Sequence, residues 1–153
     1  MSDLFTLRPA TATDAPTIQA LIRQAGINPT GLKWARFVLA IRADGEIVGC
    51  GQIKPHLDGS HELASLAVVP AWQGHGIARM LIAHLLTTHV GELYLMCRAS
   101  LGPFYEKFGF QKLADSHMPP YFRRIKTLTK LAEFVMQEGE LLWVMHRPST
   151  NNT

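Results

Sequence analysis

Short apolar runs separated by turn residues dominate the first half of the chain. Their length and their content of Val, Ile, Leu and aromatic residues are typical of β-strands. Asp-Gly pairs at 44–45 and 58–59 stand between consecutive runs and predict tight hairpin turns. We therefore expect an antiparallel meander, with its strands at residues 4–8, 34–41, 46–54 and 62–69.

The run at 62–69 is apolar enough to be buried on both faces of a sheet. It ends at Pro70, which has no N–H to donate to a neighbouring strand. After a few small residues, the apolar period changes to that of one helical face and predicts a helix over 75–89. This period is carried by Ala78, Leu81, Ile82 and Leu85.

The same signals predict further helices and strands. Residues 13–26 carry an apolar helical stripe that a glycine closes. A short helix can begin at Pro103, with Phe104 and Phe108 on its inner face and Gly109 as its C-cap. The remaining strands are expected at 92–97, 110–113 and 140–146.

Residues 118–138 form a separate amphipathic segment. Two interpretations stay open: a packing helix with a solvated basic face, or a lid over a binding site or a dimer surface. The apolar face comprises Tyr121, Ile125, Leu128, Ala132 and Val135, and the basic face comprises Arg123, Lys126 and Lys130.

The turn at 73–78, Gln-Gly-His-Gly-Ile-Ala, has the features of a phosphate site. Free N–H groups at a helix start, together with the positive end of the helix dipole, favour an anion. Small residues let phosphates approach the backbone. A Walker A motif is excluded because no Gly-Lys-Ser/Thr tripeptide occurs. A dinucleotide fingerprint is disfavoured because Arg79 stands where a small residue is required, although Glu92 is spaced like a ribose-binding acid.

This turn resembles the acetyl-CoA loop of the GNAT acetyltransferase superfamily, Gln/Arg-x-x-Gly-x-Gly/Ala, with Gln73, Gly76 and Ala78 at the marked positions. The preceding Glu-x-x-x-Leu-Ala-Val strand begins at Glu62, and the downstream Phe-Tyr-Glu-Lys-Phe-Gly-Phe stretch occupies 104–110. Both occur in the family's order, which makes the resemblance strong.

The resemblance covers residues 5–147 and leaves 148–153 as a polar tail. It implies a single α/β (α+β) domain of GNAT type. Its central sheet would be mixed and mostly antiparallel, with about six or seven strands flanked by about four or five helices.

The implied reaction moves the acetyl group of acetyl-CoA to a primary amine by direct attack in a ternary complex. A lysine-like amine is almost entirely protonated near pH 7, so it needs a base, and the leaving thiolate needs an acid. Glu62 matches the family's general base and Tyr105 its general acid. Strand alternation groups Glu62 with Ala64 and Leu66, unless a bulge intervenes. The cofactor-binding residues carried over are Leu66, Ala67, Val68, Gln73, Gly74, His75, Gly76, Ile77, Ala78 and Arg79.

Structural or non-catalytic alternatives to these assignments stay open. Glu62 could be a strand-edge carboxylate and Tyr105 a buried helix aromatic. The chain could be a non-catalytic acyl-CoA-binding regulatory module, or a nucleic-acid binder that uses 121–130. The acceptor could be a polyamine, an arylalkylamine, an amino acid, an antibiotic amine, or a protein lysine or N-terminus. A homodimer stays open.

Composition and charge further restrict the classes of ligand and location that the sequence favours. The net charge of +3 favours anionic ligands but lacks the dense basic patch of a nucleic-acid binder. The seven histidines form no zinc-like cluster with cysteine, so no metal is expected. No apolar run reaches membrane-span length, and no secretory signal precedes the first strand. Cys50 and Cys97 are expected to be buried free thiols, as in a cytoplasmic protein.

Overall fold

The computed structural model describes residues 4–133 and 141–150. They fall into two compact units. The first comprises the chain up to Lys54 together with Leu63–His89, and the second comprises Pro55–Glu62 together with the chain from Val90 onward. In hydrogen-bonding order the seven strands run β1-β2-β3-β4-β5-β7-β6, so the expectation of a mixed sheet with about six or seven strands is confirmed.

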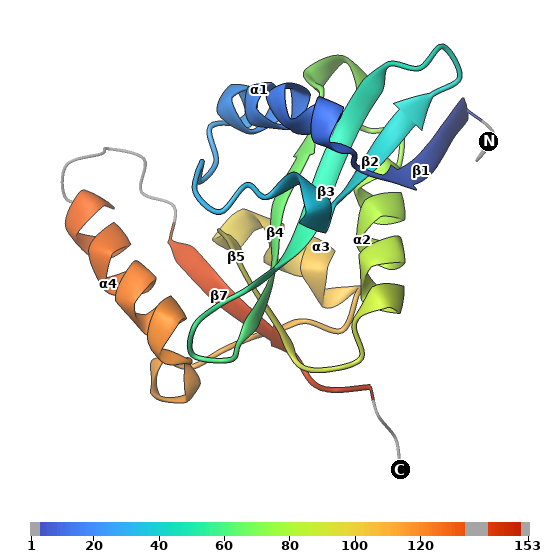
Figure 1. Ribbon diagram of the computed structural model, residues 1–153. Helices are drawn as coiled ribbons and strands as arrows, with labels where there is room; N and C mark the ends of the chain where they lie inside the picture. The colour runs from blue at the N-terminus through green and yellow to red at the C-terminus, as the bar shows by residue number, and fades with distance from the viewer. Residues whose placement is uncertain (1–3, 134–140, 151–153) are drawn as a thin grey trace. The chain divides into compact units, whose positions relative to one another are not determined.

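The first unit holds the predicted meander (Figure 1). β1 pairs with β2 and β2 with β3, both in the antiparallel sense. The strands are β1 (Phe5–Pro9), β2 (Phe37–Arg42), β3 (Ile47–Pro55) and the greater part of β4 (His61–Val68), and the helices are α1 (Ala15–Ala25) and α2 (Ile77–Thr88). The left-handed glycine that closes α1 is Gly26, as predicted.

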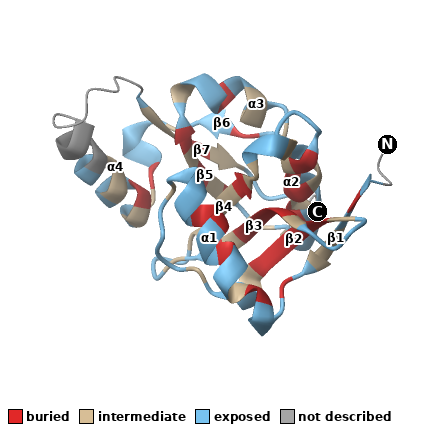
Figure 2. Cartoon of the chain, turned by 90° about the horizontal axis from the view of Figure 1, so that it is seen from above, coloured by how far each residue is buried: buried red, intermediate tan, exposed pale blue. Residues whose placement is uncertain are grey.

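Side chains on alternate positions of β3 face different helices. Cys50 lies in the core cluster with Ile18 and Ile22 of α1. A Cβ on Gly49 would come within 3.0 Å of Ile77 in α2. Glycine here lets α2 pack closely against the sheet, while α1 covers the opposite face. Figure 2 shows buried residues gathered along β2 and β3, and five of the six residues of β2 are buried.

The second unit pairs β5 with β7 and β6 with β7, both antiparallel. The first residues of β4 also belong here, and Glu62 pairs in parallel with Tyr94 of β5. Met118, Phe122 and Val144 form this unit's core cluster. Its elements are β5 (Leu93–Arg98), α3 (Gly102–Glu106), β6 (Gln111–Lys112), α4 (Pro120–Glu133) and β7 (Leu142–Arg147).

Several predicted boundaries change. Residues 34–36 form a 3-10 turn ahead of β2 rather than part of a strand. α3 ends at Glu106, and two hydrogen-bonded turns continue to Gly109, whose φ is 90°. The segment expected to run to residue 138 is helical to Glu133, and the expected positions Val135 and Glu140 lie outside the described residues.

The predicted apolar face of α4 is partly wrong. Leu128 is 55% exposed, whereas Phe122, which the pattern did not select, is fully buried against Val144. α4 is oriented with the larger aromatic ring inward, because burying a phenyl group removes more apolar surface from water than burying a leucine side chain. Within the described ranges, no helix is both long and apolar enough to cross a membrane.

Candidate functional site

The turn that leads into α2 has the backbone that a phosphate site needs. Gly74 and Gly76 have φ values of 82° and 79°, in the left-handed region that favours glycine. The first intrahelical bond runs from the N–H of Met80 to the carbonyl of Gly76, at 3.0 Å. The N–H groups between these two residues therefore precede the helical ladder and are available to an anion.

Glycine at 74 and 76 is required by conformation and not by crowding. A Cβ at either position would meet no atom within 4 Å. The turn is therefore open, and one buried residue, Ile77, anchors it against the sheet. The exposed residues of the predicted cofactor set are Gln73, Gly74, His75, Gly76 and Arg79, with Ala78 half-buried.

Side-chain contacts stabilise this turn. The guanidinium carbon of Arg42 lies 4.4 Å from the ring centre of Trp72, whose ring meets that of His75 edge to face at 5.2 Å. Nδ1 of His75 lies 3.1 Å from the carbonyl of Gln73. The amide of Gln73 donates to the carbonyl of Val68 at 3.2 Å, which ties the turn back to β4. Gln73 thus has a positioning role in the turn that the motif alone did not specify.

β4 departs from regular extension at Ser65, whose φ is 57°. This conformation costs a non-glycine residue on the order of 1–3 kcal/mol. It is held by the buried amide of Gln52, which donates to Ser65 Oγ at 2.7 Å and to the Gly31 carbonyl at 3.2 Å. Strict alternation along β4 is interrupted at this point, as a bulge would do.

The expected burial of β4 on both faces is only partly met. Glu62, Leu63 and Ala67 are buried, whereas the other residues of the strand are half-buried. Ala67 lies in the core cluster with α1, and Leu66 lies on the side of Gly51 that faces α2. These predicted cofactor-contacting positions belong to the first unit, whereas Glu62 and Tyr105 belong to the second.

Glu62 is buried and paired. Its Oε1 lies 2.8 Å from Nε2 of His56, with the side chains 8% and 7% exposed respectively. The His56 ring stacks on the ring of Tyr121 at 3.5 Å between centroids, and Phe122 meets it edge to face at 5.6 Å. An edge carboxylate at a strand start would be solvated, so the surroundings of Glu62 are those of an internal polar pair.

An open hollow of about 390 Å³ adjoins this pair. His56 lines it, and Asp58 and Arg124 bring charge of opposite sign to its rim. Burial raises the pKa of Asp58, but hydrogen bonds from Ser60 and from the Tyr121 backbone outweigh this effect and lower it, so Asp58 is an anion near neutral pH. The remaining lining residues are Pro55, Leu57, Pro120 and Tyr121.

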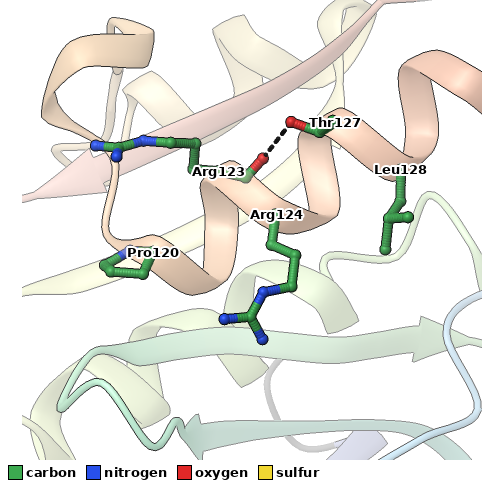
Figure 3. Close-up of a pocket in the computed structure, with 5 residues that line it drawn as sticks. All are labelled: Pro120, Arg123, Arg124, Thr127 and Leu128. Carbon is green, nitrogen blue, oxygen red and sulfur yellow. Dashed lines mark hydrogen bonds between the residues drawn. The ribbon is translucent and has the colours of Figure 1, made fainter.

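A second hollow, of about 360 Å³, lies along α4 (Figure 3). Arg124 and Leu128 extend to the same side of the helix, and Arg123 extends to another. The guanidinium of Arg123 donates to the carbonyl of Met118 at 3.0 Å, which fixes it at the helix start. Arg124 lines both hollows, so it is a basic residue of α4 that borders the His56 side.

Tyr105 lies in α3 with its ring half-buried among aromatic neighbours. Its ring meets those of Phe104 at 5.1 Å and Phe110 at 6.4 Å. Burial, with a smaller contribution from Cys97, raises the pKa of Tyr105 to about 12. The phenol therefore keeps its proton at neutral pH and could donate it. Phe104 and Phe108, which were expected on one face, have their ring centroids 5.5 Å apart.

The two cysteines are free and buried, as expected. Burial raises the pKa of the Cys50 thiol to about 12 and that of Cys97 to about 11. Neither forms a nucleophilic thiolate readily near neutral pH. In the part of the chain that the structure describes, no group of three or more His, Cys, Asp or Glu side chains is suited to a metal ion.

Sequence reasoning did not select His56 as a site residue. The signal was present in the turn itself, since an Asp-Gly hairpin between 56 and 60 brings residue 56 close to the start of the next strand. The bonds His56 N–H to Ser60 O, at 2.9 Å, and Gly59 N–H to His56 O, at 3.0 Å, form that hairpin. Tyr121 could not be foreseen at this site, because its contact depends on where α4 packs.

Comparison with known proteins gives a consistent family signal. The family model described as Acetyltransferase (GNAT) domain matches residues 33–112. This range contains the 73–78 turn, Glu62 and Tyr105. No curated protein matches the chain significantly in sequence.

Solved structures share the fold at low sequence identity. N-acetylglutamate synthase from Neisseria gonorrhoeae, complexed with coenzyme A and N-acetyl-glutamate, has a TM-score of 0.71 and 23% identity over 96% of this chain and 35% of its own. This chain thus spans about a third of that protein's length. Rv2747 from Mycobacterium tuberculosis, in complex with CoA and NLQ, has a TM-score of 0.69 and 21% identity over 94% of this chain and 98% of its own. The ribosomal-protein-S18-alanine N-acetyltransferase from Escherichia coli has a TM-score of 0.68 and 20% identity over 97% of this chain and 96% of its own.

Proposed function

Because this chain belongs to the acetyltransferase (GNAT) domain family, we propose that it transfers the acetyl group of acetyl-CoA to a primary amine of a small molecule or protein. The observation that carries the proposal is the family match, which spans the phosphate-type turn and both candidate catalytic residues. Two structural neighbours are described in complex with coenzyme A or CoA, which supports acetyl-CoA as the co-substrate.

The pyrophosphate of acetyl-CoA binds the backbone N–H groups of the turn at 73–79. The left-handed glycines at 74 and 76 and the free N–H groups at the start of α2 support this placement. The backbone of residues 66–68 holds the pantetheine arm and the acetyl carbonyl, as the resemblance implies.

Glu62 takes the proton from the acceptor ammonium, directly or through water. The freed amine nitrogen attacks the thioester carbonyl carbon, and the C–S bond breaks as the tetrahedral intermediate collapses. The departing thiolate takes a proton from the Tyr105 hydroxyl, the nitrogen releases its surplus proton to solvent water, and the Tyr105 phenolate regains a proton from solvent, so the products are an amide and free CoA thiol. Burial raises the pKa of Tyr105 to about 12, so the phenol carries its proton at working pH.

Direct attack in a ternary complex is favoured over an acetyl-cysteine intermediate. A covalent route needs a thiolate nucleophile. Burial raises the pKa of Cys50 to about 12 and that of Cys97 to about 11, so both remain thiols near neutral pH. Direct transfer uses the amine itself as the nucleophile and requires no cysteine.

The experiment that tests this function follows CoA thiol release from acetyl-CoA with a panel of acceptors. The panel contains amino acids, polyamines, arylalkylamines, aminoglycosides and short peptides with free lysine or N-terminal amines. Amine-dependent thiol release at a saturable rate supports the proposal. CoA binding by calorimetry without release for any acceptor class would instead support a non-catalytic acyl-CoA-binding module.

A further inference from the structure

The carboxylate of Glu62 has a hydrogen-bond partner, His56, whose role the family resemblance does not specify. Nε2 of His56 lies 2.8 Å from Glu62 Oε1, and both side chains are more than nine-tenths buried. A carboxylate only accepts hydrogen bonds, so the hydrogen between the two atoms lies on Nε2. A base that accepts such a hydrogen bond keeps one orientation. In catalytic dyads, one group orients the reacting group through a hydrogen bond in the same way.

The 56–60 hairpin sets the position of His56. Its carbonyl accepts from Gly59 and its N–H donates to Ser60, so the residue is fixed at both backbone groups. Asp58 Oδ1 accepts from the N–H and the hydroxyl of Ser60, at 2.9 Å and 2.6 Å, which stabilises the turn. The turn between β2 and β3 uses Asp44 in the same manner, with the Glu46 N–H at 3.0 Å.

The first turn of α4 then holds the His56 ring. The second carboxylate oxygen of Asp58 accepts the backbone N–H of Tyr121 at 3.0 Å, which anchors the helix start to the hairpin. The Tyr121 ring stacks on the imidazole with 3.5 Å between centroids and an interplanar angle of 17°. The Phe122 ring meets the imidazole edge to face, with 5.6 Å between centroids. Asp58, Tyr121 and Phe122 together leave the imidazole little freedom to rotate away from Glu62.

We propose that His56 is a positioning residue for Glu62, which it holds in one orientation for proton abstraction through the Nε2–H hydrogen bond. This inference rests on the proposed role of Glu62 as the base. A hydrogen bond to the charged form of a carboxylate favours that form, so loss of the donor disfavours the form that accepts the proton. The predicted signature is therefore pH-dependent and not a uniform loss of activity.

Other charged or titratable groups face this pair and contribute to its field. The hairpin supplies Asp58 and α4 supplies Tyr121 and Arg124. β5 supplies Tyr94, opposite Glu62, and β7 supplies His146, whose ring lies 4.9 Å from that of Tyr94. These groups are left intact in each variant below, so their contribution is common to all profiles.

The test compares the pH dependence of kcat/KM for the acceptor in wild type, His56→Ala, His56→Gln and His84→Ala. Glutamine places an amide N–H near the position of Nε2, and so conserves the donor. His84 is an exposed histidine of α2 and serves as the matched control. His56→Ala should lower kcat/KM about tenfold on the acidic side of the profile but much less on the basic side, because a one-unit shift of the acidic limb changes the rate about tenfold at pH values below that limb. His56→Gln should recover most of this loss, and the KM for acetyl-CoA should not change.

The outcomes separate this inference from the proposed function. An acidic limb at the wild-type pH in folded His56→Ala, or a loss equal at all pH values that His56→Gln does not rescue, overturns the role of His56. Glu62→Gln is measured alongside. If Glu62→Gln keeps the wild-type profile, the proposed base is wrong; if Glu62→Gln loses the limb while His56→Ala keeps it, only the His56 inference fails.

Discussion

Nε2 of His56 lies 2.8 Å from Oε1 of Glu62 in a buried pair. Three segments meet at this point: the 56–60 hairpin, the start of β4 and the first turn of α4. The glutamate that the family resemblance selects as a base is thus supported by an imidazole and an aromatic ring from a helix about 60 residues downstream. His56 of this pair also lines an open hollow of about 390 Å³.

The 73–79 turn is tested by placing charge at Gly76. Any non-glycine residue there must adopt a φ of 79°, so Gly76→Ala is the matched control for the backbone cost. Gly76→Asp adds a carboxylate in open space, where phosphate repulsion should weaken CoA binding about tenfold or more beyond the alanine variant. Calorimetric titration with CoA measures both. Equal affinities for the two folded variants would show that the pyrophosphate binds elsewhere.

Tyr105→Phe removes one hydroxyl and keeps the ring that packs against Phe104 and Phe110. Thermal stability should change little, and turnover should fall by about 10²–10⁴, the usual worth of general acid–base catalysis. Because the pKa of Tyr105 is raised to about 12, the wild-type profile should show no loss of activity from its ionisation below about pH 11. Wild-type turnover in the phenylalanine variant would reduce Tyr105 to a packing residue.

Arg124 of α4 tests whether residues 118–138 border the acceptor site. It lines the hollow beside His56, whereas Arg123 is held at the helix start by Met118. Arg124→Ala should change the KM for the acceptor by about threefold or more and leave that for acetyl-CoA unaltered, since one rim charge contributes on the order of 1 kcal/mol. Arg123→Ala is the matched control. Equal changes in both KM values would favour a structural or dimer role for this helix.

Asp14 gives a stability prediction that is independent of function. Hydrogen bonds from Arg8 at 2.8 Å and 3.1 Å, and then from the Thr11 N–H at 2.7 Å, hold its pKa far below the usual range. A depressed pKa contributes stability above the unfolded value near 4, and this contribution is lost as the pH falls below it. Asp14→Asn should therefore lower the free energy of unfolding by about 1–2 kcal/mol at pH 7 and by less near pH 3. Urea unfolding at the two pH values measures the difference, and an equal loss at both would contradict it.

Much of the fold could be predicted from local patterns. The hairpins at Asp44-Gly45 and Asp58-Gly59 form where the sequence places them, and Gly26 closes α1. These features depend on residues near one another in the chain, where spacing and turn chemistry determine the conformation. The order of β5, β7 and β6 depends on pairings between distant segments, and neither the local patterns nor the resemblance predicted it.

The candidate site was predicted only in part, for the same physical reason. The glycines of the turn signal their conformation locally, whereas the left-handed Ser65 depends on a bond from Gln52 on the neighbouring strand. His56 could have been paired with the start of β4 from the hairpin alone. Its stacking on Tyr121 depends on how α4 packs, and the helical pattern placed Leu128 inside rather than Phe122.

The measurement that tests the central claim most directly is the rate of amine acetylation by wild type and Glu62→Gln across pH, with the acetylated acceptor identified by mass spectrometry. Glutamine keeps the shape of Glu62 but cannot take a proton at neutral pH. We predict that wild type forms the acetylated amine, and that Glu62→Gln is slower by about 10²-fold or more near pH 7 and recovers partly as rising pH deprotonates the free amine. No acetylated product from any amine in the wild-type reaction would contradict the proposed function. A Glu62→Gln profile that follows wild type at every pH would contradict the mechanism.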